Sequence, residues 1–178
     1  MKKNTIVIAM AAVLAFTGPA AYAAAQDWLI QPQKITPGVL NPNVSQANIA
    51  TTVCKSGWTA TIRPTVAYTN KLKATQLAGD YKYLTKDYGT EMSKYEEDHL
   101  ISLQLGGNPS DPKNLWPQPY AGSNARKKDV VETALKRLVC AGTIKLADAQ
   151  HMIATDWPAA YKKYVTKADA AVVNTEDN

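Results

Sequence analysis

One short stretch of the sequence, YEEDHLISLQLGG from Tyr95 to Gly107, concentrates the side chains that can do chemistry. Three carboxylates stand directly before His99, one of only two histidines in the chain. Carboxylate oxygens can hold a divalent cation, and a neutral imidazole can accept a proton from water. A solvated charge run is the alternative interpretation, and the glycine-rich loop that follows the stretch argues against it.

The elements around this stretch must position those side chains. Residues 100–105 alternate between apolar and polar types after Ile101, which predicts a short strand that ends at the two glycines. The loop sequence GGNPSDPKN, residues 106–114, has the composition of a tight surface loop. Leu115 and Trp116 then begin a second short apolar segment, which we expect Pro117 and Pro119 to end.

A helix is predicted directly after these segments. Ser123 is a good N-cap for the run NARKKDVVETALKRLVCAG, whose apolar residues form one stripe, and Gly142 is expected to close the helix. The local order is therefore strand, loop, strand and helix.

Weaker patterns describe the rest of the chain. Residues 51–63 are rich in β-branched types and predict one or two short strands before Pro64, and residues 65–79 have helical spacing. A helix is expected from about Leu146, with a break near Thr155 and Asp156 and a new start at Trp157 and Pro158. The tail from Lys167 is polar and is expected to fray.

The spacing of four residues carries a family resemblance. Asp98 and His99 are followed by Asn114 fifteen positions after the histidine, and by Asn124 at the head of the helix. This pattern resembles the ββα-metal finger of the HNH endonuclease superfamily. The stretches YEEDHLISLQLGG, NLWPQP and NARKKD, with flanks over roughly residues 52–161, are similar to small secreted bacterial HNH nucleases.

The resemblance implies a role for each of these residues. Asp98 would ligate a metal ion and His99 would be the general base, while Asn124 would add a second protein ligand from the first helical turn. In the family the central asparagine is a brace, so Asn114 would orient His99 through the loop backbone. Adjacent strand residues point to opposite sides, so Asp98 can face the metal while His99 faces a water.

The ligand types indicate which metal would bind. A carboxylate and an amide suit one hard divalent cation such as Mg²⁺ or Mn²⁺ better than Zn²⁺, which usually takes more nitrogen or sulfur. Such a cation would stabilise charge on the phosphate and on the leaving 3′ oxygen.

A basic cluster of Arg126, Lys127 and Lys128 follows Asn124 in the first turns of the same helix. Cations are unfavourable at that end of the helix dipole, so phosphate binding is one explanation for them, and a solvated basic face is the other. The formal net charge of +5 is by itself weak evidence for nucleic acid.

The N-terminus and the two cysteines indicate the compartment. Residues 1–23 have the basic start, the short apolar stretch and the small residues of a secretory signal peptide, and no segment predicts a membrane anchor. Cys54 and Cys140 would then most simply form one disulfide, which closes a long loop and stabilises the fold by about 4 kcal/mol.

These patterns lead to one overall prediction. The fold is α+β, a mostly helical single domain built around a ββα finger with short N-terminal strands. After the signal peptide we expect an irregular arm over residues 24–50, a nuclease domain over 51–166 and a polar tail over 167–178.

The predicted function is a periplasmic or extracellular metal-dependent endonuclease with little sequence preference. Its partner would be nucleic acid, with DNA favoured over RNA and no membrane involved, and the sequence indicates no protein partner. Two alternatives stay open: a ββα module that binds or supports without catalysis, and a cell-wall hydrolase that uses a carboxylate pair.

Overall fold

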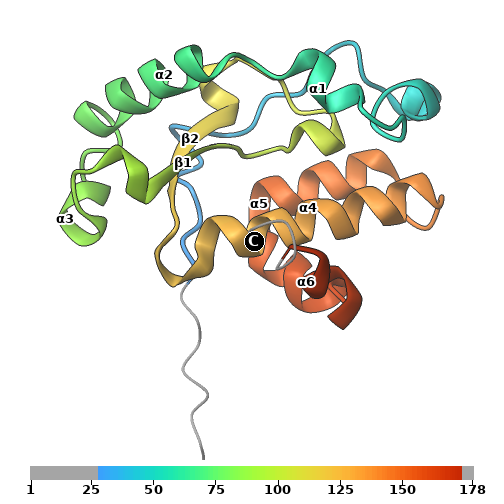
Figure 1. The fold of residues 1–178 in the computed structure, drawn as a ribbon. Helices are drawn as coiled ribbons and strands as arrows, with labels where there is room; N and C mark the ends of the chain where they lie inside the picture. Colours follow the sequence, from blue (N-terminus) through green and yellow to red (C-terminus); the bar gives the residue numbers. More distant parts are fainter. Residues whose placement is uncertain (1–27, 174–178) are drawn as a thin grey trace, which may run out of the picture.

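The computed structural model describes residues 28–173, so the predicted signal peptide and the last five residues lie outside the described residues. The described part is mixed α and β and mostly helical, with a single two-stranded antiparallel sheet (Figure 1). The α-helices are α1 (Trp58–Ile62), α2 (Val66–Ala78), α3 (Leu84–Tyr88), α4 (Asn124–Cys140), α5 (Leu146–Tyr164) and α6 (Lys167–Val173).

The sheet pairs β1 (Tyr95–His99) with β2 (Leu115–Pro119) in a register that sets Asp98 opposite Trp116 and His99 opposite Leu115. Helix α2 packs against both strands, α4 packs against β2, and α4 and α5 pack on each other. The buried core includes Trp116 of β2, Leu135 of α4 and Trp157 of α5. The strands thus lie between α2 and the α4–α5 pair, as Figure 1 shows.

The strand predicted over residues 100–105 is wrong, because the strand lies five residues earlier. Leu100 and Ile101 leave the sheet, and residues Leu103–Leu105 form the short 3-10 helix η3. The amide of Asn114 accepts from Ile101 N at 3.0 Å and donates to Ile101 O at 3.0 Å. A side chain therefore occupies the backbone groups that a strand partner would need, and the alternating leucines are all buried without forming a ladder.

The predicted N-terminal strands are also wrong. Residues 58–62 form α1, which follows Gly57 in the left-handed conformation (φ 76°), and Thr61 Oγ1 donates to Trp58 O at 2.6 Å. The β preference of branched residues is a weak guide where no neighbouring strand is paired with the segment. Pro117 does not end β2, because both strands of this sheet are edge strands and an edge tolerates proline, whereas β2 does end at Pro119.

Three predicted helical features are confirmed. Helix α2 covers the expected segment and stops before Gly79, and α4 starts directly after Ser123 and is followed by Gly142 with φ 73°. The expected break in the C-terminal helix is a kink at Asp156 (φ −154°, ψ 70°) inside α5. Asp156 Oδ1 accepts from Ala159 N at 2.9 Å and so caps the second half of the helix.

The ends of the described chain are tied to the domain. Residues 28–45 run without helix over the surface, where Gln31 Nε2 donates to Ala154 O of α5 at 2.9 Å and Leu40 pairs with Gly107 in a single bridge. The described part of the predicted polar tail, residues 167–173, is not frayed as expected, because it forms α6 and Asp169 is ion-paired with Arg137 of α4.

The predicted disulfide is confirmed. Cys54 and Cys140 are bonded, with their Cα atoms 5.6 Å apart. The bond joins the segment before α1 to the last residue of α4.

Candidate metal centre beside His99

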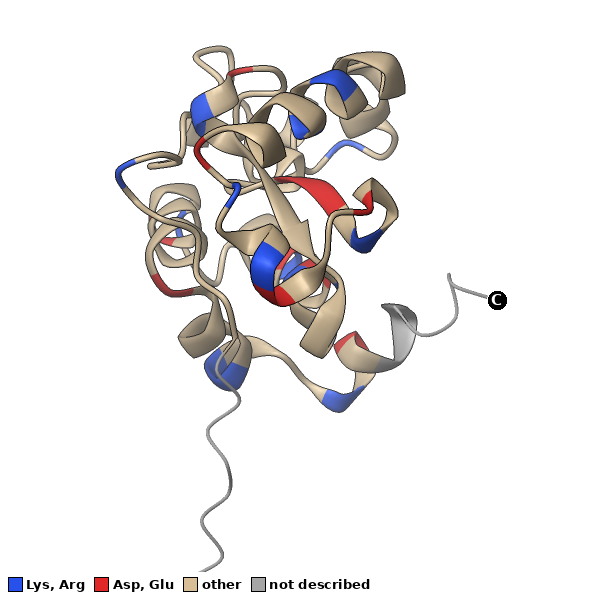
Figure 2. Cartoon of the chain, turned by 90° about the vertical axis from the view of Figure 1, so that its left-hand side faces the viewer, with Lys and Arg blue, Asp and Glu red and all other residues tan. Residues whose placement is uncertain are grey.

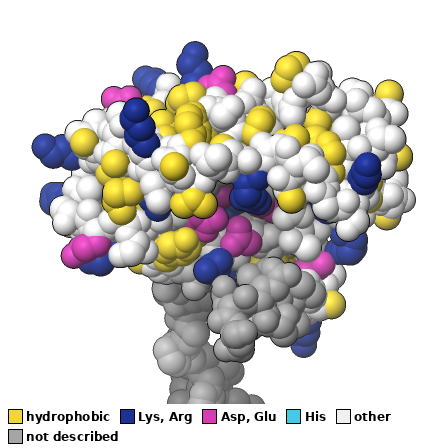
Figure 3. All heavy atoms as spheres, turned by 45° about the horizontal axis from the view of Figure 1, so that its top comes forward, with side chains coloured by type: hydrophobic (Ala, Val, Ile, Leu, Met, Phe, Trp, Pro, Cys, Tyr) yellow, Lys and Arg dark blue, Asp and Glu magenta, His cyan; other side chains and the backbone are white. Residues whose placement is uncertain are grey.

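A cavity of about 330 Å³ opens beside β1 and α4, and its lining is dominated by charged side chains. The space-filling view shows acidic side chains inside a hollow of the surface and basic side chains at its edge (Figure 3). In the cartoon coloured by charge, acidic residues of β1 lie near a stretch of α4 that carries both signs (Figure 2).

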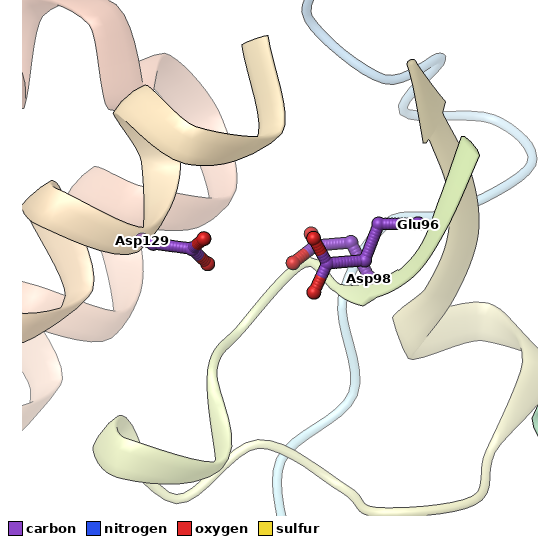
Figure 4. Close-up of side chains that lie close together, drawn as sticks. All are labelled: Glu96, Asp98 and Asp129. Carbon is purple, nitrogen blue, oxygen red and sulfur yellow. The ribbon is translucent and has the colours of Figure 1, made fainter. Parts of the chain in front are cut away.

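Three carboxylates converge in this cavity. Glu96, Asp98 and Asp129 each offer an oxygen, and these oxygens all lie within 4.8 Å of one another. Figure 4 shows Glu96 and Asp98 extending from β1 toward Asp129 of α4. Side chains two apart on a strand share a face, so the strand itself sets Glu96 and Asp98 side by side. Such a cluster of oxygens has the composition of a site for a hard divalent cation.

Asp98 is held by two donors on one oxygen. Trp116 Nε1 donates to Asp98 Oδ2 at 3.1 Å, and Lys128 Nζ lies 2.8 Å from the same oxygen. These contacts fix the plane of a carboxylate that is itself buried. The other oxygen, Oδ1, is the one through which Asp98 can ligate a cation.

Lys128 is completely buried and joins three groups around the cavity. Its ammonium contacts Asp98, donates to Glu132 Oε1 at 2.6 Å and donates to the backbone carbonyl of His99 at 2.8 Å. Burial works against the charged ammonium, but Asp98 and Glu132 outweigh it and keep the pKa of Lys128 above its usual value. Ser102 Oγ donates to Glu132 Oε2 at 2.6 Å and completes this network.

The carboxylates of the cavity are short of positive charge. Burial raises the pKa of Asp129 and of Glu96, and neighbouring carboxylates raise both further. Burial also raises the pKa of Glu97 to about 8, although Lys73 opposes this rise. Among the described residues, Glu96 Oε2 and both carboxylate oxygens of Glu97 are buried without a hydrogen-bond partner. A divalent cation would supply the missing charge and the missing partner for Glu96.

His99 lines the same cavity in a form suited to accept a proton. Its Nε2 lies 2.8 Å from Pro109 O, and since a carbonyl can only accept, Nε2 carries the proton. The lone pair is then on Nδ1. Burial lowers the pKa of His99 to about 4, so the ring is neutral at neutral pH, even though the bond to Pro109 favours the charged form.

Asn114 organises the loop that carries Pro109. Besides its two bonds to Ile101, its Nδ2 donates to Asn108 O at 2.9 Å. A Cβ atom on Gly107 would collide with the carbonyl oxygen of Ile101 and with the amide of Asn114, so only glycine permits this close approach. Asn114 thus holds the backbone at both ends of this loop, and it does not line the cavity.

Asn124 is not placed as the sequence predicted. Its Oδ1 accepts from Leu29 N at 2.7 Å and its Nδ2 donates to Ala121 O at 2.6 Å, so both ends of the amide are engaged. It does not line the cavity, and its contacts tie the N-terminal segment to the start of α4.

The three residues of the predicted basic cluster point in different directions. Arg126 lines the cavity, lies over the ring of Tyr120 and is 3.7 Å from Asp129 Oδ2 through its Nη1. Lys127 instead contacts Tyr161 of α5 at 3.3 Å. Lys128 is buried, which removes it from the predicted set of surface phosphate contacts. The burial of Lys128 argues against both explanations for that residue, while phosphate binding by Arg126 and Lys127 stays a prediction.

Two carboxylates of the centre, Glu96 and Asp129, were missed in the sequence. The signal for Glu96 was available, because its position two residues before Asp98 puts both on one face of a strand. Asp129 has no local signal, since only the packing of α4 beside β1 brings it to the cavity. Arg63, which also lines the cavity, lay in the flanking region of the resemblance and was not predicted as a site residue.

No protein-family model matches the chain, and no match was found among curated proteins or solved structures. Within residues 28–173, no helix combines the length and the hydropathy needed to cross a bilayer.

Proposed function

We propose that the protein is a metal-dependent endonuclease that hydrolyses phosphodiester bonds of DNA, and of RNA as a second substrate, with little sequence preference. The observation that carries the proposal is one cavity that combines three convergent carboxylate oxygens with a neutral histidine. Phosphodiester hydrolysis needs an activated water and stabilised charge on the phosphate and the leaving oxygen, and these groups address both needs.

The donor set supports a hard cation. Glu96, Asp98 and Asp129 would hold Mg²⁺ or Mn²⁺ through oxygen atoms, whereas a zinc site would usually include nitrogen or sulfur ligands. When bound, such a cation supplies positive charge to the phosphate oxygens and to the leaving 3′ oxygen. The orphaned oxygen of Glu96 is the feature of the chain that fits this group best.

His99 would activate the water. The Pro109 carbonyl fixes the ring through Nε2, and Nδ1 accepts the proton of a water that attacks phosphorus. Asn114 supports this orientation, because it holds the backbone on both sides of the loop that carries Pro109. The chain order of β1, β2 and α4 around this site supports a relation to the ββα-metal finger.

The two other functions left open by the sequence are less well supported. A glycosidase uses one pair of carboxyl groups about 5 to 9.5 Å apart, whereas three carboxylates here each bring an oxygen to within 4.8 Å of the other two. A binding module without turnover does not require Asp98, His99 and Asn124 to converge on one space. Asp98 and His99 do line one cavity, which supports the enzyme, whereas Asn124 does not. The disulfide supports an exported enzyme, because such bonds persist in oxidising compartments.

The test is plasmid nicking by the purified, disulfide-bonded protein with EDTA, Mg²⁺, Mn²⁺ or Zn²⁺. We expect cleavage with Mg²⁺ or Mn²⁺, none with EDTA, and a loss of at least about 100-fold in rate in His99→Ala. His151→Ala is the matched control, because His151 is exposed on α5 and does not line the cavity. If folded protein cleaves neither DNA nor RNA with any of these metals, the proposal is wrong.

A further inference from the structure

The placement of the arginines is selective. The chain has three arginines, and two of them, Arg63 and Arg126, line the cavity, while Arg137 pairs with Asp169. Among the described residues, no lysine lines the cavity, although lysines are far more numerous in the chain. Guanidinium groups bind phosphate in a planar, two-pronged geometry that an ammonium cannot provide.

Arg63 lies in the short connection between α1 and α2, and local contacts hold the backbone of this connection. It follows α1, where its N–H donates to Thr59 O at 3.1 Å, and it precedes Pro64, whose ring fixes the backbone. Thr65 then caps α2 by accepting from Tyr68 N at 3.3 Å. The backbone of Arg63 is therefore fixed on both sides, while its side chain belongs to an exposed residue that can reach a solute.

Arg63 and Arg126 come to the cavity from different parts of the fold. Arg63 lies between α1 and α2, whereas Arg126 lies in the first turn of α4. Figure 1 shows α1 and α4 as separate elements on two sides of the chain that leaves β1. Arg63 is also near enough to Glu96 and His99 for its charge to act on both.

The negative charge of the cavity is a physical reason for arginines among its lining residues. Its interior carries Glu96, Asp98 and Asp129, which repel a polyanion, so a phosphate chain needs positive charge at the edge to approach. We propose that Arg63 is a phosphate-binding residue that holds the polynucleotide backbone beside the metal centre, where the connection between α1 and α2 meets the cavity. This inference rests on the proposed function, and it adds a residue that binds substrate.

The test measures binding apart from cleavage. A fluorescein-labelled DNA duplex is titrated with His99→Ala protein in Mg²⁺ buffer at several KCl concentrations, and its anisotropy gives the affinity. Adding Arg63→Gln to this background is expected to weaken binding several-fold and to reduce the salt slope of log K by about 0.9, the value for one lost phosphate contact. Arg63→Lys is expected to restore the slope and only part of the affinity.

Lys55→Gln is the matched control, because it removes one positive charge from an exposed residue of the same segment that does not line the cavity. It is expected to leave both affinity and slope unchanged. If the His99→Ala protein binds DNA and folded Arg63→Gln in that background has the same salt slope, the inference is overturned and the nuclease proposal stands. Binding that depends on Arg63, without cleavage by the wild type, would support the inference and overturn the nuclease proposal. Absence of binding by the parent would overturn both.

Discussion

Lys128 is the residue on which the centre most depends without being a ligand. Its ammonium is ion-paired with both Asp98 and Glu132 and donates to the backbone carbonyl of His99, so one side chain joins α4 to the end of β1. Removing one partner of a buried ion pair leaves the others as uncompensated charges, which costs far more than the pair itself contributes.

We predict that Lys128→Met lowers the free energy of unfolding by about 3 to 5 kcal/mol. The neighbouring Lys127→Met should cost less than about 1 kcal/mol, because it removes one hydrogen bond to the partly exposed Tyr161 and the cation–π contact with the same ring. Urea denaturation of both variants gives the two values. Equal effects would contradict the assignment of Lys128 to a buried network.

Asp129 and Asn124 have different roles: Asp129 belongs to the carboxylate cluster, whereas Asn124 anchors the N-terminal segment. Asp129→Asn should weaken Mn²⁺ binding by at least about tenfold, since it removes charge from the carboxylate cluster. Asn124→Ala should leave Mn²⁺ binding unchanged and lower stability by about 1 to 3 kcal/mol, because it removes the hydrogen-bond partner of Leu29 N and of Ala121 O.

Isothermal titration with Mn²⁺ and urea denaturation of the same two variants separate these effects. A loss of Mn²⁺ affinity in Asn124→Ala, with normal affinity in Asp129→Asn, would restore the ligand set inferred from the sequence.

Helix α4 has a different task along each part of its length. Its first residue, Asn124, anchors the N-terminal segment, and its second and third turns present Lys128, Asp129 and Glu132 toward β1. Residues three and four apart share a helix face, which lets Lys128 and Glu132 pair while Asp129 reaches the carboxylates of the strand. Its last residue, Cys140, holds the segment that leads to α1.

The ion pair between Arg137 of α4 and Asp169 of α6 makes the stability of the fold depend on pH. Arg137 donates two hydrogen bonds of 3.1 Å to Asp169, and burial of Asp169 is outweighed by these bonds and those from Thr166, so its pKa is lowered. A lowered folded pKa adds stability above the unfolded pKa of about 3.9, and this stability is lost as the pH falls through the folded value.

Arg137→Ala should therefore reduce stability by less than about 1 kcal/mol at pH 7, because Arg137 is half exposed. The difference from the wild type should shrink as the pH falls below about 3.9 and disappear once the pH lies below the lowered pKa of folded Asp169. Urea denaturation at several pH values measures it. A difference that stays constant as the pH falls would show that the ion pair is not its source.

At the scale of the whole molecule, the disulfide joins the two parts of the chain that flank the cavity. Cys54 precedes α1 and the Arg63 connection, and Cys140 ends α4, so the 86-residue separation between them includes the entire centre. The bond restricts the unfolded chain over this long loop.

We predict that Cys54→Ser with Cys140→Ser lowers the free energy of unfolding by about 4 kcal/mol relative to the oxidised wild type. Urea denaturation with and without reductant measures it, and the reduced wild type should match the double variant. A stability loss below about 1 kcal/mol would show that packing alone holds α1 and α4 in place.

The sequence by itself determined the features that depend on neighbours along the chain. Helix α2 and its end at Gly79, the start of α4 after Ser123 and the kink at Asp156 each follow from capping, spacing or proline within a few residues. The disulfide followed from counting, because two cysteines allow one pairing. The stretch from Tyr95 to Gly107 could also be recognised as the source of Asp98 and His99.

Only the tertiary structure decided which groups meet. The alternating leucines after His99 predict a strand, but the amide of Asn114 takes the hydrogen bonds of Ile101 N and O that a strand partner would need. The strand lies instead at the acidic residues before them. Packing of α4 beside β1 then brings in Asp129 and buries Lys128, while the bond to Leu29 removes Asn124 from the centre. These contacts join residues distant in the sequence, so no local pattern specifies them.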